Sequence, residues 1–257
     1  MTNEGSTSLA RAIALLSELG TPEAAQSGGF GVVQLAKLIG REKTQVSRTL
    51  AVLADSGFVL RDQETLKYRL GWRLYALAAS TIDQQLLTLA PTVLRQLVAR
   101  VNEAAHLSAL ENQQVLTLMS ETPGRTIQGN GLVGRATPMY CTSAGRVLLF
   151  DHDDDEVREM IAKSGFPPGG PNAPTDEADF LSRLHDARRA GYAVVHEEYE
   201  RGVVAVAAPV RDFSGRVVAA INISFPTFRA EDVLLSGARE VQAAAMHLTR
   251  TLCARRP

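Results

Sequence analysis

Apolar residues recur every three or four positions in three segments near the start of the chain, and this spacing predicts three helices. The helices are expected over residues 8–20, 32–40 and 43–56, with a polar, glycine-rich loop over residues 21–29 between the first two. Two residues separate the second helix from the third. In the first helix the apolar stripe consists of Leu9, Ile13, Leu16 and Leu19.

The third helix, which reads KTQVSRTLAVLADS, is polar in its first turns and apolar in its later ones. Thr44 and Arg48 project from one side, and the small residue Ala51 follows them along the helix. At 100° per residue, a single stripe on the other side contains Val46, Leu50, Leu53 and Ala54. We predict that this stripe anchors the helix and leaves the polar side chains exposed.

Beyond Gly57 the pattern changes from helical to alternating, which predicts a short hairpin. Its strands read FVLRD and LKYRL, and the turn between them reads DQET. In the second strand Leu66, Tyr68 and Leu70 are expected on one face, and Lys67 and Arg69 on the other. The order helix, turn, helix and charged hairpin is the topology of a winged helix-turn-helix.

The rest of the chain predicts a long helical run and then a mixed α/β domain. The run covers residues 72–89, and Pro91 is expected to restart the chain. A hairpin is expected over residues 106–120 and a glycine-rich loop over residues 124–135. Further helices are predicted over residues 91–103, 143–150, 153–165, 177–191 and 231–253, and strands over residues 192–198, 203–212 and 216–225.

Composition and charge narrow the class of protein. The 257 residues are 45% hydrophobic and 21% charged, as in ordinary globular proteins with one or two domains. Residues 30–73 carry a net charge of +4, although the whole chain carries −1, so the remainder carries −5. Such a local basic patch is typical of a nucleic-acid-binding module joined to another domain, and chance fluctuation is the alternative.

The two cysteines and the lengths of the apolar runs indicate in which cellular compartment the protein is expected. Cys141 and Cys253 lie far apart, which argues against a disulfide scaffold and a zinc site and fits a reducing cytoplasm. No signal-peptide pattern is readable at the start of the sequence, and no apolar run approaches the ~18 residues of a membrane helix. We therefore expect a cytoplasmic protein with no membrane partner.

A helix that enters the major groove must present hydrogen-bonding side chains in its first turns and a small residue behind them. The helix over residues 43–56 meets this requirement, and the hairpin supplies cations for phosphate oxygens. The predicted contacts with double-stranded DNA are Lys43, Thr44, Gln45, Ser47 and Arg48 on the helix, and Arg61, Lys67 and Arg69 on the hairpin. The alternatives are a solvated helix face and a helix that contacts another protein.

The chain resembles the IclR family of bacterial transcriptional regulators over nearly its whole length. The segments that carry the resemblance are SLARAIALLSELG, VVQLAKLIGREKTQVSRTLAVLADSGFVLRD, YRLGWRLYALA, MYCTSAGRVLL and GYAVVHEEYERGVVAVAAPVRDFSGRVVAAINIS. The resemblance implies an α+β protein with a winged helix-turn-helix over residues 6–71, a linker helix over residues 72–90 and a GAF-like α/β effector-binding domain over residues 91–254. It also implies a dimer or tetramer that binds a palindromic operator and responds to a small-molecule effector.

Two features depart from the family pattern in the DNA-binding part. The loop over residues 21–29 looks longer than is usual between the first two helices. In addition, Leu66 stands where the family commonly has glycine in the turn of the hairpin. Leucine disfavours the positive φ that glycine permits, so we expect this turn to have a different shape.

Carried over residue by residue, the resemblance places an effector pocket in the second domain. The implied positions are Thr142, Ser143, Ala144, His196, Ala205, Asn222 and Ser224. Asn222 and Ser224 are two apart in a strand and therefore share a face, which faces either the pocket or solvent. Small hydroxyl and backbone N–H donors suit a carboxylate, including an aromatic acid. The family often has Asp at Val195 and Cys at Ala205, so we expect a more apolar pocket here.

Catalysis and metal binding have weaker support. A nucleophilic Cys141 would need a nearby base, and no motif links it to a histidine. The acids in HDDDE, residues 152–156, fit the start of a helix better than a metal site. GNGLVGRATP, residues 129–138, reads as a loop near a pocket, and His106 as a core histidine. We expect no cofactor, and an enzyme acting on a small acid, tethered to DNA, is the alternative to a ligand-responsive regulator.

Overall fold

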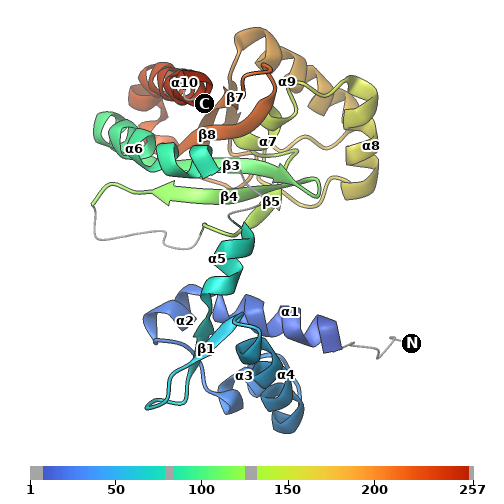
Figure 1. Ribbon diagram of the computed structural model, residues 1–257. Helices are drawn as coiled ribbons and strands as arrows, with labels where there is room; N and C mark the ends of the chain where they lie inside the picture. The colour runs from blue at the N-terminus through green and yellow to red at the C-terminus, as the bar shows by residue number, and fades with distance from the viewer. Residues whose placement is uncertain (1–7, 79–83, 125–131, 255–257) are drawn as a thin grey trace. The chain divides into compact units, whose positions relative to one another are not determined.

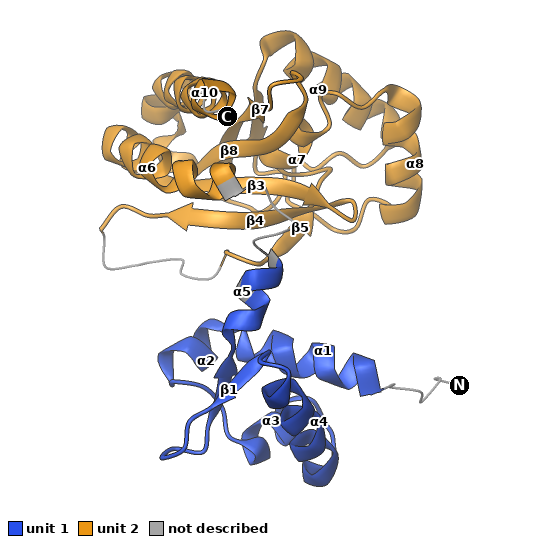
Figure 2. Cartoon of the chain, viewed as in Figure 1, with its two compact units in different colours: residues 1–84 blue, residues 85–257 orange. Residues whose placement is uncertain are grey.

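The computed structural model describes residues 8–78, 84–124 and 132–254 and divides the chain into two compact units (Figures 1 and 2). The N-terminal unit comprises residues 1–84 and the C-terminal unit residues 85–257. The division falls within the predicted linker over residues 72–90. Of that linker, residues 79–83 lie outside the described part of the chain.

Four helices and a hairpin build the N-terminal unit, and a fifth helix follows them (Figure 1). Their bounds are α1 Ser8–Leu19, α2 Pro22–Gln26, α3 Val32–Leu38, α4 Lys43–Asp55, β1 Val59–Arg61, β2 Tyr68–Leu70 and α5 Trp72–Ala78. The predicted helices and hairpin are confirmed. The core contains Leu15, Leu35, Val46, Leu50, Val59 and Tyr68, because each element buries one apolar stripe against the others.

The stripe predicted on the first helix is partly wrong. Leu15 and Leu19 are buried, whereas Leu9 and Ile13 are 67% and 56% exposed. The helix therefore packs against its own unit through its C-terminal half. Two large apolar side chains remain on its surface.

The predicted loop over residues 21–29 contains a short helix, α2. Thr21 caps it by accepting a hydrogen bond from the backbone N–H of Ala24, and Pro22 occupies its first turn. These start signals were readable in the sequence, but the five-residue segment is too short to show a helical period. The longer connection is thus an ordered element rather than an open loop.

Leu66 adopts the conformation that we expected leucine to avoid. Its φ is 56°, in the left-handed region. The turn is held by Asp62, whose Oδ1 accepts hydrogen bonds from the backbone N–H groups of Glu64 and Thr65 and from the Thr65 hydroxyl. The predicted faces are also wrong in part, since Tyr68 is buried but Leu66 and Leu70 are 51% and 38% exposed.

We expect Leu66→Gly to raise the free energy of unfolding of the N-terminal unit by about 1 kcal/mol, because glycine relieves a left-handed strain of roughly 1–2 kcal/mol. Little packing is lost with this exposed side chain. Urea denaturation followed by fluorescence of Trp72, the single tryptophan, measures the change. Leu70→Gly, which removes a strand residue from the same hairpin, is the matched control and should destabilise. A loss of stability in both variants would contradict the prediction.

A six-stranded antiparallel sheet forms the centre of the C-terminal unit, in the order β5-β4-β3-β8-β7-β6. The strands are β3 Ala104–Glu111, β4 Gln114–Glu121, β5 Ala136–Pro138, β6 Ala193–His196, β7 Val203–Arg211 and β8 Val217–Pro226. Alternation along β7 and β8 sends successive side chains into two separate cores. The predicted strands and the hairpin between β3 and β4 are confirmed, whereas β5 lies at the end of the segment 129–138 that we interpreted as a loop, and it was missed.

Helices cover both faces of this sheet (Figure 1). One core contains residues of α6 Gln84–Val101 and α10 Ala230–Ala254. The other contains residues of α7 Ser143–Leu148, α8 Asp154–Ser164 and α9 Glu177–Ala190. A 3₁₀ turn over Thr227–Arg229 joins β8 to α10. No helix in the described ranges has the length and apolar character that crossing a bilayer requires.

The prediction that Pro91 restarts the chain is wrong, because α6 continues through it. The buried stripe of α6 runs on both sides of the proline and includes Leu86, Ala90, Leu94 and Leu97. Packing of this stripe against the sheet outweighs the backbone hydrogen bond that proline cannot donate. Ile82, which belonged to the predicted linker helix, lies outside the described residues.

The acidic residues 153–156 form the cap and first turn of α8, as predicted. Asp153 accepts a hydrogen bond from the Glu156 N–H, and the Glu156 side chain accepts one from the Asp153 N–H, which is a capping box. In the described part of the chain, no group of three or more His, Cys, Asp or Glu side chains is arranged to hold a metal ion.

Candidate ligand pocket and DNA-contact surface

The polar start of α4 is exposed, and its apolar stripe is buried. Val46 and Leu50 have no exposed surface. Gly40, with φ 62°, turns the chain between α3 and α4, and the Arg41 N–H closes this turn on the Ala36 carbonyl. The structure leaves solvent-exposed the five predicted contacts on this helix, Lys43, Thr44, Gln45, Ser47 and Arg48.

The three basic side chains of the hairpin differ in their contacts with the rest of the N-terminal unit. The Arg61 guanidinium lies 5.7 Å from the centroid of the Tyr68 ring, a cation–π distance. The Lys67 ammonium donates to the Ser27 carbonyl at 2.7 Å, so it is tied to the segment after α2. Arg69 is exposed. Arg11 of α1, which we had not considered, reaches Thr49 of α4 with an Nη1–Oγ1 distance of 3.4 Å.

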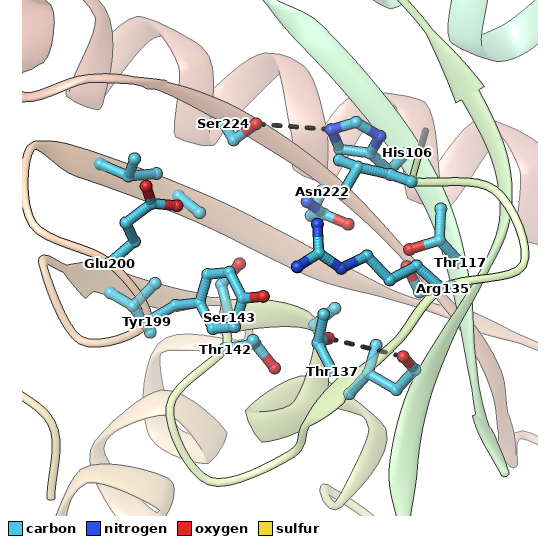
Figure 3. Close-up of a pocket in the computed structure, with 17 residues that line it drawn as sticks. His106, Thr117, Arg135, Thr137, Thr142, Ser143, Tyr199, Glu200, Asn222 and Ser224 are labelled. Atoms are coloured by element: carbon cyan, nitrogen blue, oxygen red, sulfur yellow. Dashed lines mark hydrogen bonds between the residues drawn. The ribbon is translucent and has the colours of Figure 1, made fainter. Parts of the chain in front are cut away.

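A cavity of about 240 Å³ opens in the C-terminal unit (Figure 3). Six of the seven predicted effector positions line it: Thr142, Ser143, Ala144, Ala205, Asn222 and Ser224. The lining residues missing from the predicted set are His106, Ser108, Val115, Thr117, Leu132, Arg135, Thr137, Val195, Tyr199, Glu200 and Val203. Asn222 and Ser224 thus face a cavity. Period-two alternation links His106 with Ser108 and Val115 with Thr117, and this signal could have found them.

His196 does not line the cavity, and its prediction is corrected. Along β6 the side chains alternate, so Val195 faces the cavity and the next residue faces away. His196 is exposed, and its backbone carbonyl accepts a hydrogen bond from the Asn172 side chain at 3.0 Å.

The floor of the cavity brings β3 and β8 together. His106 lies opposite Asn222 and Ala104 opposite Ser224 in the antiparallel register. The His106 Nε2 atom lies 3.4 Å from the Ser224 hydroxyl oxygen, and its Nδ1 atom has no hydrogen-bond partner among the described residues. Burial lowers the pKa of His106 to about 4, so the imidazole is neutral near pH 7. His106 is thus buried, as expected of a core histidine, but its side chain also lines the cavity.

Most of the cavity surface is apolar, as expected. Val195 and Ala205 are paired on β6 and β7, and Val203 extends this wall. The rest of the lining combines Val115, Leu132 and Ala144 with hydroxyl groups on β3, β4, β5 and β8 and with two charged side chains, Arg135 and Glu200. These polar groups lie on other elements than Val195 and Ala205, the two positions from which we expected a more apolar pocket.

The Thr142 hydroxyl is committed within the protein. It donates to the Pro138 carbonyl at 3.0 Å and accepts from the Gly145 N–H at 3.2 Å as the cap of α7. Ser143 and Ala144 follow it along the cavity wall. Thr142, the cap residue of α7, therefore has a structural role. Its hydroxyl proton is already used and is not available to a ligand.

Cys141 has the environment of a core residue. It is 1% exposed, and burial raises the pKa of its thiol to about 11. A nucleophilic cysteine requires a lowered pKa and access to substrate. This environment opposes nucleophilic chemistry at Cys141.

The sequence is similar to those of known transcriptional regulators. Residues 78–250 match the family model of the bacterial transcriptional regulator IclR C-terminal domain. Over 201 residues, 78% of this chain, it is 30% identical to the HTH-type transcriptional regulators KdgR of Dickeya chrysanthemi and of Escherichia coli K12, and covers 66% and 76% of their lengths.

The fold is shared with solved structures. An IclR homolog from Microbacterium hydrocarbonoxydans, complexed with 4-hydroxybenzoate, superposes with a TM-score of 0.80 and 23% identity, covering 96% of this chain and 99% of that one. The chain therefore belongs to the IclR family of bacterial transcriptional regulators.

Proposed function

We propose that the N-terminal unit is a winged helix-turn-helix whose α4 enters the major groove of an operator. The observation that carries this proposal is the exposed start of α4, where Thr44, Gln45 and Arg48 offer donors and acceptors while Val46 and Leu50 fix the helix. Arg61, Lys67 and Arg69 on the hairpin, together with Lys43 and Ser47, would contact phosphate oxygens.

We expect Arg48→Ala to weaken operator binding by about 1–3 kcal/mol, which is roughly 5- to 140-fold, because a bidentate contact to a base is lost. Fluorescence anisotropy with DNA from upstream of the protein's own gene, at several salt concentrations, measures the change. Arg189→Ala on α9, an exposed arginine of the C-terminal unit, is the matched control. Equal affinities of the two variants would refute the recognition role, and binding that ignores salt would refute the whole interface.

The cavity of the C-terminal unit is the proposed effector site. Ser143, Ala144, Ala205, Asn222 and Ser224 line it as the family resemblance implies, and Thr142 shapes its wall. An Arg135 guanidinium at this cavity favours a small carboxylate. The 4-hydroxybenzoate held by a structural relative makes aromatic acids a reasonable first class to screen.

Regulation then follows from a shift between conformations. An effector that binds one arrangement of the protein more tightly than another changes the population that fits the operator. The regulator would be a dimer or tetramer acting on chromosomal DNA in the cytoplasm, without catalysis. The exposed Leu9 and Ile13 on α1 suit a subunit contact. Thermal-shift screening of small carboxylates, followed by anisotropy with the same DNA, tests whether the ligand that stabilises the protein also changes DNA binding.

A further inference from the structure

We propose that Arg11 of α1 binds a phosphate group of the operator backbone, beside the groove that α4 enters. This inference rests on the proposed winged helix-turn-helix, and it adds a contact on a third element, outside α4 and the hairpin. Because a phosphate carries no base identity, Arg11 would contribute affinity for DNA of any sequence.

The guanidinium of Arg11 is held at one point. Its Nη1 atom lies 3.4 Å from the Thr49 hydroxyl oxygen, longer than most hydrogen bonds, and this is its one hydrogen bond among the described residues. The Nε atom is buried and has no partner in the same part of the chain. A guanidinium has five N–H donors, so most of its capacity to donate is unused.

Arg11 also differs from the other arginines that are partly or fully buried. Within the described ranges it is half-buried and forms no ion pair with a carboxylate. Each of the five other buried or half-buried arginines of these ranges has such a pair: Arg146, Arg183, Arg188, Arg211 and Arg229. Taking a cation partly out of water without an anion costs free energy. The exception at Arg11 therefore points to an anion that comes from outside the chain.

The position of Arg11 indicates which anion this is. In the N-terminal unit α1 packs against α4, and Thr49 lies one turn beyond Gln45 on α4 (Figure 1). The Thr49 hydroxyl donates to the Gln45 carbonyl at 3.0 Å. Since Gln45 belongs to the exposed start of α4, the Arg11 guanidinium lies at the edge of the proposed DNA-contact surface. Phosphates line both sides of a groove, so a cation at this edge meets the DNA backbone.

Shape and position favour the same ligand. A guanidinium can donate two parallel hydrogen bonds to the oxygens of one phosphate, which an ammonium group cannot do. At 100° per residue, Arg11 lies about 160° around α1 from both Leu9 and Ile13. A contact with DNA through Arg11 therefore leaves the exposed Leu9 and Ile13 available to a partner subunit.

Removing the charge tests the contact. We would measure the affinity of Arg11→Gln by fluorescence anisotropy at several salt concentrations. The two probes are DNA from upstream of the protein's own gene and a duplex of the same length and base composition in shuffled order. The variant should bind both duplexes about three- to tenfold more weakly than the native protein. The slope of log affinity against log salt concentration should become shallower by about 0.9, the value for one phosphate.

Two further variants control for a purely structural role. Thr49→Val removes the hydrogen bond and keeps the Arg11 charge, so its slope with salt should equal that of the native protein. Arg11→Lys also keeps the charge, and it should lose less affinity than Arg11→Gln, with the native slope. An unchanged slope in Arg11→Gln, or an equal loss of affinity in Thr49→Val and Arg11→Gln, overturns the inference, because Arg11 would then only position α4.

The stability of the DNA-free protein gives an independent readout. Because the Arg11 charge is partly desolvated and unpaired, Arg11→Gln should not lower the free energy of unfolding of the N-terminal unit. Urea denaturation followed by Trp72 fluorescence measures it. A lower stability together with an unchanged salt slope assigns Arg11 to the fold and overturns the inference. If Arg11→Gln does not fold, Arg11→Met, which keeps the aliphatic stem, replaces it in the same measurements.

Failure of this inference can be distinguished from failure of the proposed function. If the native protein binds DNA in a salt-dependent way and Arg11→Gln has the same slope, the DNA-contact surface stands without Arg11. If the native protein binds neither duplex, or if its binding ignores salt, the proposed winged helix-turn-helix is wrong, and this inference is wrong with it.

Discussion

Replacing Glu198 by glutamine is expected to lower the free energy of unfolding of the C-terminal unit by about 3–5 kcal/mol, the range found when one partner of a buried ion pair is removed. The Arg146 Nη2 and Glu198 Oε2 atoms lie 2.5 Å apart, and the two side chains are 3% and 6% exposed. Arg146 Nη1 also donates to the Val194 carbonyl at 3.1 Å. Without the carboxylate, the Arg146 charge stays buried and uncompensated.

Urea denaturation followed by far-UV circular dichroism measures this loss. Arg100→Ala, which removes an exposed ion pair with Glu240 between α6 and α10, is the matched control and should cost less than about 1 kcal/mol. Adding Arg146→Met to Glu198→Gln should recover part of the stability, because the unpaired charge is then gone. A Glu198→Gln protein as stable as the Arg100→Ala protein would show that the pair is not what holds α7 to the segment after β6.

His106 is expected to make the C-terminal unit less stable in mild acid. Its pKa is about 4 in the folded protein against 6.5 in the unfolded chain, so the unfolded chain binds the extra proton between these values. The free energy of unfolding therefore falls as the pH drops from about 6.5 to 4. The loss contributed by this one residue reaches roughly 3 kcal/mol and stays constant below pH 4.

His106→Leu isolates this contribution from that of other titrating groups. Urea denaturation at pH 7, 5.5 and 4.5 should show a smaller dependence on pH in the variant than in the native sequence. Arg135 and Glu200, the charged residues of the same cavity, remain in both proteins and cancel in the comparison. If the stabilities of the two proteins depended on pH in the same way, the prediction would be wrong. The imidazole would then be hydrated in the folded protein, although its burial indicates that it is desolvated.

Periodicity predicted the element types well, because the buried stripes of α4 and β8 are set by local spacing. It failed where packing overrides a local signal. Pro91 looked like a break, but the stripe from Leu86 to Leu97 is continuous across it. Leu66 looked unsuited to its turn, but the hydrogen bonds accepted by Asp62 hold the turn closed around it.

The cavity needed information that no single segment holds. The positions on α7 and β8 could be transferred from the family because they lie in the segments of this sequence that resemble it. His106 and Thr117 join them only through strand register, and Arg135 only through its backbone bonds to β4 and the preceding turn. The placement of His196 in the cavity was wrong because it also depends on strand geometry. Neighbouring residues of β6 point to opposite faces of the sheet.

The pairing of β3 with β8 has a consequence for biosynthesis. His106 and Ser224, which meet at the cavity floor, are separated by 118 positions in the sequence. The buried core of the N-terminal unit, in contrast, lies within residues 15–68. During synthesis the N-terminal unit can therefore fold as soon as it leaves the ribosome, whereas the cavity floor is completed only after β8 has emerged and paired. A nascent chain would therefore present the proposed DNA-contact surface before the proposed effector site is complete.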